Sequence, residues 1–196
     1  MGRPSVLVID NQDSFTFMLV DHLRCIGAEV RVERSDELGI EEALQIASDA
    51  ILISPGPGTA EESGICVPLA RSCVERGKPL LGVCLGHQAI AIACGSRVER
   101  VAPVHGKVAT VRHDGTGIFS GLPSPLPMTR YHSLGIRELR SPLIANAWSE
   151  DGVAMAFRHE TAAVHGVQFH PESVASAQGH ALLEKFIRIA TQSAES

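Results

Sequence analysis

Short apolar runs alternate with amphipathic stretches along the first half of the chain. Residues 5–10, 50–54 and 79–83 are runs rich in Val, Ile and Leu, which is typical of strands buried on both faces of a parallel sheet. Between these runs, apolar residues recur at spacings of three and four, which predicts helices. The helices are expected near residues 15–26, 40–46, 66–76 and 88–94, with one further strand at 29–33.

The pattern changes after Gly95, where short extended pieces are separated by Gly, Pro and Asp turns. A last apolar strand is expected at 163–169, and the apolar positions between 182 and 190 fall on one face of a closing helix. The extended pieces predict antiparallel strands, which lie at 97–101, 107–112, 128–131, 144–149 and 153–158.

Strands that alternate with helices imply right-handed crossovers between parallel strands. We therefore predict an α/β fold, with an open, mostly parallel twisted sheet, helices on both faces and a small antiparallel elaboration. No linker, repeat or low-complexity tract divides the chain, so residues 1–196 are expected to form a single domain. The composition agrees, because 44% of the residues are hydrophobic and 20% are charged, as in ordinary globular proteins.

The net charge bears on which partners are expected, and the number of cysteines bears on the cellular compartment. A formal net charge of −5 leaves no basic excess for contacts with a nucleic-acid backbone or an anionic membrane. No apolar run reaches the roughly 18 residues that a membrane helix needs, and the N-terminal residues show no signal-peptide core. Five cysteines, an odd number, suggest reduced thiols, so we expect a cytoplasmic protein. Four of them resemble small core hydrophobes, namely Cys25, Cys66, Cys73 and Cys94.

The fifth cysteine, Cys84, lies in the segment Gly-Val-Cys-Leu-Gly at residues 82–86, between a predicted strand and a predicted helix. This spacing is that of a nucleophile elbow, in which a strained turn raises the nucleophile above the sheet and small neighbours prevent clashes. The helix, expected to begin at about His87, points its N-terminus toward Cys84 and favours the thiolate. The Leu85 N–H is placed to stabilise an oxyanion. The alternative is a buried strand-end thiol between two packing glycines.

A second candidate group, His170 and Glu172, comes just after the last apolar strand. Ligands of an open parallel sheet bind beyond the carboxyl ends of its strands, so His170 and Cys84 are expected at the same edge. Pro171 fixes the backbone between the two side chains, which lets Glu172 hold one imidazole nitrogen while the other faces the thiol. Cys84, His170 and Glu172 then form a triad for covalent acyl transfer. The alternative is a loop histidine beside a solvated glutamate.

A third candidate is the loop Ser-Pro-Gly-Pro-Gly at residues 54–58, which follows the third strand. Its glycines permit positive φ and close approach to a ligand, so the Gly58 N–H is a second candidate oxyanion donor. A plain tight turn is the alternative. Cys84 and His87 have the spacing of half a zinc site, but no second pair at metal-ligand spacing exists, so no metal is expected.

Together these segments resemble those of the class I, triad-type glutamine amidotransferases. The matching stretches are residues 54–58, 82–88 and 166–173. The resemblance covers essentially the whole chain and implies the flavodoxin-like fold of that family. Within the family, the chain resembles the amidotransferase subunit of chorismate-aminating synthases, namely anthranilate synthase component II and aminodeoxychorismate synthase component II. The stretches that carry this closer resemblance are residues 10–16, 105–107 and 130–134.

The resemblance implies a role for each matching residue. The triad would be Cys84, His170 and Glu172, and the oxyanion hole would be formed by Gly58 and Leu85. The residues that would hold the glutamine substrate are Gly56, Pro57, Gly58, Gln88, Ser133 and Leu134. The residues that would face a chorismate-binding partner subunit are Asp13, Ser14, His105, Gly106 and Lys107.

The resemblance also implies a reaction and an assembly. The expected function is hydrolysis of glutamine through a thioester on Cys84, with delivery of ammonia to a synthase subunit that makes anthranilate, in a heterodimer or heterotetramer. The chain itself is expected to need no cofactor, with Mg²⁺ in the synthase subunit. The alternatives are aminodeoxychorismate synthesis, a subunit shared by both pathways, or a stand-alone γ-glutamyl hydrolase. A non-catalytic binding subunit is the remaining alternative, and the complete Cys-His-Glu set argues against it.

Overall fold

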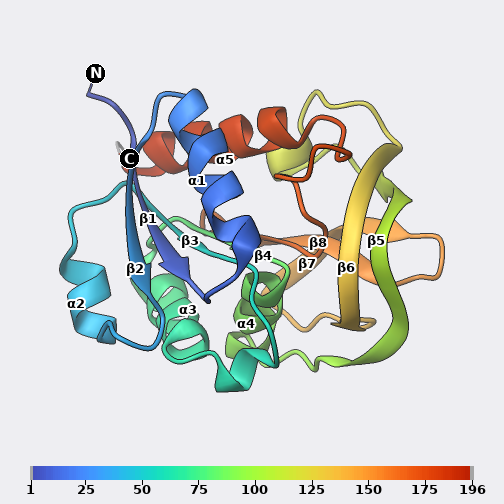
Figure 1. Ribbon diagram of the computed structural model, residues 1–196, viewed down its shortest axis with the longest axis horizontal. Helices are drawn as coiled ribbons and strands as arrows, with labels where there is room; N and C mark the ends of the chain where they lie inside the picture. The colour runs from blue at the N-terminus through green and yellow to red at the C-terminus, as the bar shows by residue number, and fades with distance from the viewer. Residues whose placement is uncertain (1, 195–196) are drawn as a thin grey trace.

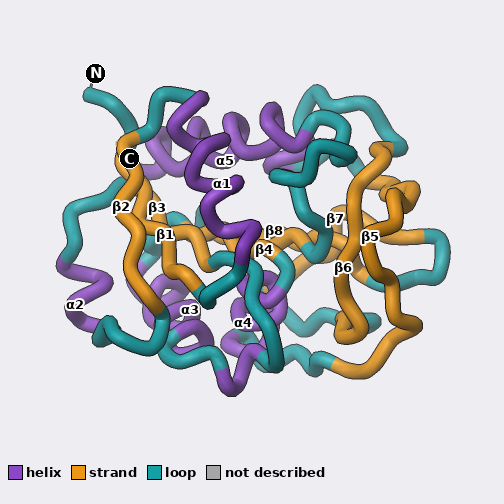
Figure 2. The backbone as a smooth tube through the Cα atoms, viewed as in Figure 1, coloured by secondary structure: helices purple, strands orange, loops and turns teal. Residues whose placement is uncertain are grey.

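The structure, a computed structural model, describes residues 2–194, and its strands form one continuous sheet (Figures 1 and 2). The strands are β1 (Ser5–Asp10), β2 (Glu29–Arg34), β3 (Ala50–Ile53), β4 (Leu80–Val83), β5 (Glu99–His113), β6 (Leu126–Gly135), β7 (Leu143–Ser149), β8 (Ala154–His159) and β9 (Val164–Val167). Their order across the sheet is β2-β1-β3-β4-β9-β8-β7-β5-β6. From β2 to β9 the neighbours are parallel, and from β9 to β6 they are antiparallel.

Helices cover both faces of the parallel half, as predicted. The helices are α1 (Ser14–Cys25), α2 (Ile40–Gln45), α3 (Cys66–Arg76), α4 (Leu85–Ala93) and α5 (Gly179–Ala194), with short 3-10 turns at η1 (Ala60–Glu62) and η2 (Gly117–Phe119). In Figure 1, α1 and α5 lie on one side of the sheet, and α2, α3 and α4 lie on the other. Alternate residues of β1 serve the two sides, because Val8 packs in the core with Leu19 of α1, whereas Ile9 packs in the core with Leu69 of α3.

The antiparallel half departs from the prediction in the length of its strands. The pieces expected at 97–101 and 107–112 belong to the single strand β5, which stays paired with β6 through two register shifts. Gly106, with φ of +64°, lies in one of these shifts. The sequence pattern predicts that the strand is interrupted near this glycine. In the structure, the glycine instead lies in a β-bulge and the strand continues past it. The last apolar strand is shorter than expected and ends at Val167.

The cysteines predicted to lie in the core differ in how deeply they are buried. Cys66 and Cys73 are buried, as expected, and Cys94 is half-buried. The expectation for Cys25 was wrong, because it is exposed at the last position of α1, on the side of the helix that faces away from the sheet core. Among residues 2–194, no helix has both the length and the apolar character needed to cross a bilayer.

The topology gathers the ends of four parallel strands at one edge. Because β1, β3, β4 and β9 run in the same direction, the segments that follow them emerge together. Cys84 follows β4, the loop at residues 54–58 follows β3, and His170 comes shortly after β9. The three segments singled out by their chemistry therefore meet at the same edge of the sheet.

One buried histidine in β9 makes the fold sensitive to acid. His165 is 4% exposed and packs near Phe186 of α5, with ring centroids 6.3 Å apart. Burial lowers the pKa of His165, and the Arg158 cation lowers it further, to about 4. As the pH falls below the ordinary histidine pKa of about 6.5, His165 becomes protonated in the unfolded chain but stays neutral in the folded protein. Stability is lost between about pH 6.5 and pH 4.

We expect His165→Gln to reduce the loss of unfolding free energy between pH 7 and pH 5 by about 2 kcal/mol, because the variant removes this proton uptake. Urea denaturation at the two pH values measures the difference. His180→Gln, at an exposed position of α5, is the matched control and should keep the wild-type difference. An identical pH dependence in wild type and His165→Gln would contradict the assignment.

Candidate active site

Cys84 links the end of β4 to the first residue of α4 and has φ of +53° and ψ of −100°. An L-residue holds such a conformation only where its surroundings impose it. Here the constraint is backbone contact, because a Cβ on Gly82 would overlap the Gly86 carbonyl and one on Gly86 would overlap the Ile53 carbonyl. The predicted nucleophile elbow is present, and both of its glycines are sterically required.

The helix after the elbow starts earlier than the sequence pattern indicated. The start expected at about His87 was wrong, because α4 begins at Leu85 with Cys84 as its N-cap residue. The residues of the first turn, from Leu85 to Gln88, are all buried, so they show none of the polar and apolar alternation that marks an amphipathic helix. The free N–H groups of the helix N-terminus therefore begin at the residue next to the thiol.

His170 and Glu172 form a buried pair. His170 Nδ1 lies 2.6 Å from Glu172 Oε1, and both side chains are almost completely buried. The His170 N–H donates to the Thr129 carbonyl at 2.9 Å, which attaches the segment after β9 to β6. The rings of Phe15 and Tyr131 pack against the imidazole at centroid distances of 4.9 Å and 5.2 Å. The imidazole is therefore fixed by a hydrogen bond and by two aromatic contacts.

The electrostatic surroundings of His170 favour its protonated form. Burial alone lowers the pKa of the imidazole, but the Cys84 thiol and the Glu172 carboxylate outweigh burial and raise that pKa to about 10. Since Glu172 holds Nδ1, the nitrogen left for Cys84 and a substrate is Nε2. The arrangement is an imidazolium beside a cysteine, which can both stabilise a thiolate and donate a proton.

The loop after β3 is fastened to the end of β1 by Asn11. The Asn11 N–H donates to Ser54 Oγ, and Asn11 Nδ2 donates to the Ser54 carbonyl, both at 3.0 Å. A Cβ on Gly56 would lie 2.5 Å from Asn11 Cβ, and Gly58 has φ of +76°, so both positions need glycine. The N–H groups of Gly58 and Leu85 donate to no protein acceptor in the part of the chain that the structure describes. Both are therefore available to a developing oxyanion.

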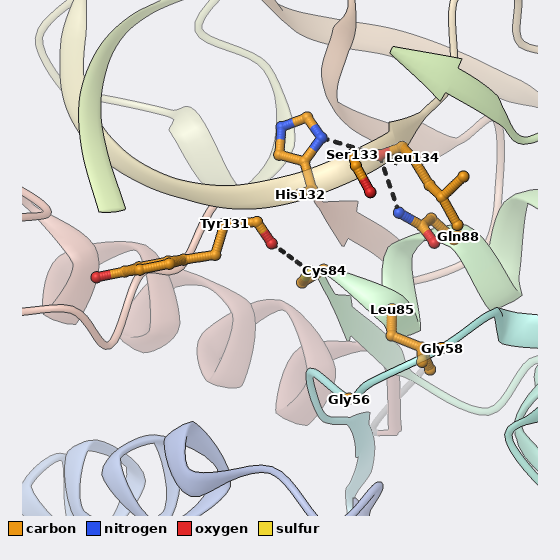
Figure 3. Close-up of a pocket in the computed structure, with 9 residues that line it drawn as sticks. All are labelled: Gly56, Gly58, Cys84, Leu85, Gln88, Tyr131, His132, Ser133 and Leu134. Carbon is orange, nitrogen blue, oxygen red and sulfur yellow. Dashed lines mark hydrogen bonds between the residues drawn. The ribbon is translucent and has the colours of Figure 1, made fainter. Parts of the chain in front are cut away.

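The elbow, the start of α4, the loop after β3 and the end of β6 enclose a pocket of about 190 Å³ (Figure 3). Gln88 Nε2 donates to the Leu134 carbonyl at 3.2 Å, and His132 Nδ1 donates to the same carbonyl at 2.8 Å. Pro57 is exposed and lies outside the lining, unlike the other residues predicted to bind glutamine. The lining residues are Gly56, Gly58, Cys84, Leu85, Gln88, Tyr131, His132, Ser133 and Leu134. The size and polarity suit a small, polar ligand.

Comparison with known proteins identifies the family. The model of the family described as glutamine amidotransferase class-I matches residues 7–190. The chain belongs to the class-I glutamine amidotransferases. Its elbow, its buried His-Glu pair and its pocket therefore occur in a family of glutamine-hydrolysing enzymes.

Curated relatives and solved structures agree with this amidotransferase family. Anthranilate synthase component 2 of Thermus thermophilus is 51% identical over 187 residues, which cover 93% of this chain and 91% of the relative. A protein named aminodeoxychorismate synthase, from Streptomyces griseus, is 50% identical over 186 residues, which cover 92% of this chain and 25% of that protein. The crystal structure of a glutamine amidotransferase from Thermotoga maritima has a TM-score of 0.81 and 18% identity, covers 97% of this chain and 99% of its own, and so shares the fold.

The amidotransferase residues predicted to face a partner lie around Tyr131. Asp13 accepts a hydrogen bond from the Phe15 N–H at 2.8 Å and caps α1, while Ser14 is exposed at the start of that helix. The ring of Tyr131 lies 5.1 Å from that of Phe15 and 5.5 Å from that of His105. The start of α1 and the bulge in β5 therefore meet beside His170. The residues of the bulge are all exposed, namely His105, Gly106 and Lys107.

Sequence patterns did not reveal the supports of the His170 backbone. Ser176 Oγ donates to the His170 carbonyl at 2.5 Å and accepts from the Thr129 N–H at 2.9 Å. Gly179, the first residue of α5, lies so close to the Pro171 carbonyl that a Cβ would overlap it. A serine in a loop and a glycine at a helix start are common, so only the three-dimensional contacts show that they position the segment that carries His170 and Glu172.

The histidine next to the elbow has different surroundings from the thiol. His87 is fully buried and stacks on Phe157, with ring centroids 4.6 Å apart. Burial lowers its pKa to about 3, so the ring is neutral. Within residues 2–194, no group of three or more His, Cys, Asp or Glu side chains is arranged to hold a metal ion.

We expect Gly86→Ala to lower the unfolding free energy by about 3 kcal/mol or more, because the added methyl group would overlap the Ile53 carbonyl in a fully packed region. Gly39→Ala is the control. Gly39 has φ of −80° and no neighbour closer than 3.9 Å to a Cβ, so its change should stay below about 1 kcal/mol. Chemical denaturation of both variants measures the contrast. Equal stability of the two would show that the elbow relaxes without cost.

Proposed function

We propose that this chain is the glutaminase subunit of a chorismate-aminating synthase and supplies ammonia to a partner subunit that forms anthranilate. The observation that carries the proposal is the position of Cys84, strained at an elbow on the wall of the pocket and beside the buried pair of His170 and Glu172. The name of the Thermus thermophilus relative, which aligns over nearly its whole length, supports the anthranilate pathway.

The pocket is proposed to bind glutamine with its side-chain amide at Cys84. The lining combines free backbone N–H groups with the polar side chains of Gln88 and Ser133, which suits an amino acid substrate. The Leu134 carbonyl, fixed by two donors, forms part of the opposite wall. Pro57 is not assigned a role in binding, because it is exposed outside the lining.

In the first half-reaction, the Cys84 thiolate attacks the carbon of the glutamine side-chain amide. A C–S bond forms, and the electron pair of the C=O bond moves to oxygen, where the N–H groups of Gly58 and Leu85 stabilise the charge. The His170 imidazolium donates its proton to the amide nitrogen. The C–N bond then breaks, ammonia leaves and a γ-glutamyl thioester remains on Cys84.

In the second half-reaction, neutral His170 accepts a proton from water as the water oxygen attacks the thioester carbon. The C–S bond breaks, glutamate is released, and the thiolate and imidazolium are restored. Glu172 keeps Nε2 of His170 directed at the reacting atoms through its bond to Nδ1. The same nitrogen, Nε2 of His170, therefore donates a proton in the first half-reaction and accepts one in the second.

The partner is proposed from the surface beside the site. Phe17 and Val174 are 60% and 100% exposed, and they lie on α1 and just after Glu172. Exposed apolar side chains of this size suit a surface that another protein covers, where they belong to one patch. In the Streptomyces griseus relative, the segment similar to this chain is a quarter of a longer protein named as a synthase, which supports ammonia transfer within one assembly. Mg²⁺ is assigned to the synthase subunit.

A second candidate function is aminodeoxychorismate synthesis, or a subunit shared by both pathways. The identity of 50% to the Streptomyces griseus protein favours this candidate almost as strongly as the identity of 51% favours anthranilate formation. A stand-alone γ-glutamyl hydrolase would use the same triad and differs only in needing no partner.

Reconstitution tests the proposal. The purified chain is combined with glutamine, chorismate, Mg²⁺ and either an anthranilate-forming or an aminodeoxychorismate-forming synthase subunit. We expect glutamine-dependent product with the anthranilate-forming subunit; product with the other subunit alone, or with both, would support the second candidate. Cys84→Ser should lower glutamine-dependent turnover by a factor on the order of 1,000 or more and leave turnover with added ammonium salt intact.

The same assay contains the outcomes that reject the proposal. High glutamate release without any partner, and no stimulation by either one, would indicate the stand-alone hydrolase. Full glutaminase turnover by Cys84→Ser would remove the nucleophile assignment.

The alkaline limb of the pH profile tests the role of Glu172. Because the raised pKa of His170 is about 10, kcat/KM for glutamine should fall only as the pH approaches that value and the imidazolium is lost. Glu172→Gln removes a carboxylate that raises this pKa, so the fall should begin at lower pH, with residual turnover reduced about 10-fold to 1,000-fold. Glu75→Gln, an exposed position, is the control. An unmoved alkaline limb in Glu172→Gln would contradict the role.

A further inference from the structure

Gln168 is a buried amide that the proposed triad leaves without a function. The side chain is fully buried, and its Nε2 lies 3.6 Å from Cys84 Sγ, within hydrogen-bonding range for sulfur. The Cys84 N–H donates to the Val167 carbonyl at 2.8 Å, and the Gln168 N–H donates to the Met155 carbonyl at 2.8 Å. The backbone next to Gln168 is therefore bonded both to the elbow and to β8.

The strand register places Gln168 beside the nucleophile. Val83 of β4 is aligned with Val167 of β9, so the next residues, Cys84 and Gln168, are also neighbours. Both the Gln168 amide and the His170 imidazole interact with the Cys84 sulfur. The amide and the imidazole come from a single short segment.

The orientation of the Gln168 amide follows from its neighbours. The Leu134 carbonyl can only accept, so the Gln88 atom that lies 3.2 Å from it is the NH₂ nitrogen. The same nitrogen lies 3.1 Å from Gln168, which must therefore present its oxygen. The NH₂ group of Gln168 is then the end that faces Cys84 Sγ. The Leu134 carbonyl thus fixes the orientation of the Gln88 amide, and Gln88 fixes that of Gln168. As a result, a hydrogen-bond donor faces the sulfur.

A second fixed group strengthens this assignment. Arg130 Nε, which can only donate, lies 3.0 Å from His132 Nε2, so His132 carries its proton on Nδ1 and donates it to the Leu134 carbonyl. Burial lowers the pKa of His132, and the Arg130 cation lowers it further, to about 4, so this ring remains neutral near pH 7. The acceptor that orients Gln88 is therefore itself held in place.

We propose that Gln168 is a further catalytic residue, whose side-chain N–H donates a hydrogen bond to the Cys84 thiolate before attack and again when the thioester breaks. This inference rests on the proposed nucleophilic role of Cys84. Sulfur carries negative charge at both of these points and loses it in the thioester, so the bond is strongest in the charged states. The Tyr131 backbone carbonyl, 4.0 Å from the sulfur, can only accept a hydrogen bond and gives a thiolate no support.

The first test is alkylation of Cys84 by iodoacetamide, followed by mass spectrometry of the peptide that contains it, so that the exposed Cys25 does not contribute. Gln168→Glu keeps an oxygen for Gln88 but places an acceptor at sulfur, and Gln168→Met removes both polar ends. We expect both variants to be alkylated at least about 10-fold more slowly at pH 7, with half-maximal alkylation at higher pH. His170 is a titratable side chain that interacts with Cys84, and the buried ring of His87 interacts with Gln168; both histidines are present in every variant. Gln45→Met, at an exposed position of α2, should match wild type.

Steady-state glutaminase kinetics separate this role from a purely structural one. A donor to the thiolate predicts a fall in kcat of about 10-fold or more with KM within about 3-fold, because the bond acts on sulfur rather than on bound glutamine. A loss of packing would instead raise KM and lower the unfolding temperature, without moving the pH of half-maximal alkylation. Wild-type alkylation and wild-type kcat in folded Gln168→Glu and Gln168→Met would overturn the proposal.

A measurement on the unmutated residue covers the case in which the Gln168 variants do not fold. In ¹⁵N spectra of the side-chain amides, one glutamine NH₂ pair should shift as Cys84 is titrated, and the shift should be absent in Cys84→Ser. No titrating glutamine amide would refute the proposal. If Cys84→Ser retains glutaminase activity, the proposed triad fails; if that variant is inactive and the Gln168 variants behave as wild type, only the present inference fails.

Discussion

Contact between backbone segments with no side chain between them is the constraint on which the site depends. The end of β3, the end of β4 and the first turn of α4 approach so closely that Gly82 and Gly86 admit no Cβ. This contact imposes the conformation of Cys84 and starts the helix at the following residue. It thereby places the thiol, a free N–H and the positive end of a helix dipole within one turn of chain. Side-chain packing elsewhere serves to keep these three segments together.

The rest of the site comes from the antiparallel half of the sheet, which curls back toward the elbow. β6 is the last strand in the sheet order, yet its residue Thr129 is bridged to His170, which follows β9 in the middle of that order. Through this bridge, β6 supplies the pocket wall from Tyr131 to Leu134. The parallel half therefore provides the proposed nucleophile and oxyanion donors, and the antiparallel half provides the proposed wall for the substrate.

Local steric rules explain why so much of the site was predictable from sequence. The elbow glycines, the Gly58 loop and the bond from His170 to Glu172 each lie within a few residues of chain, so their spacing reports their geometry. Contacts between distant segments leave no such pattern, which is why the roles of Ser176, Gly179 and Asn11 appeared only in the structure. The start of α4 was misplaced for a related reason, because a turn buried on every side lacks amphipathic contrast.

The role proposed for Gln168 combines a local sequence feature with a contact between distant segments. Gln168 precedes His170 by only two residues, so the sequence places it close to the proposed base. That closeness becomes informative only once β9 is known to lie next to β4, because distance along the sequence does not show which side chains face Cys84. The fold class, by contrast, follows from the repeated change between buried strands and amphipathic helices, which requires no long-range information.

The central position of β9 has a consequence for the order of events during synthesis. β9 is the last strand along the chain, but it lies between β4 and β8 and joins the two halves of the sheet. A ribosome-bound chain that has not yet emerged past residue 164 contains Cys84 but lacks β9 and the proposed base that follows it. Such a nascent chain cannot hydrolyse glutamine, and insertion of a central strand at the end of folding makes the pairing highly non-local, which slows the final step. With the proposed triad, activity requires the complete sheet, and unfinished chains are expected not to consume glutamine.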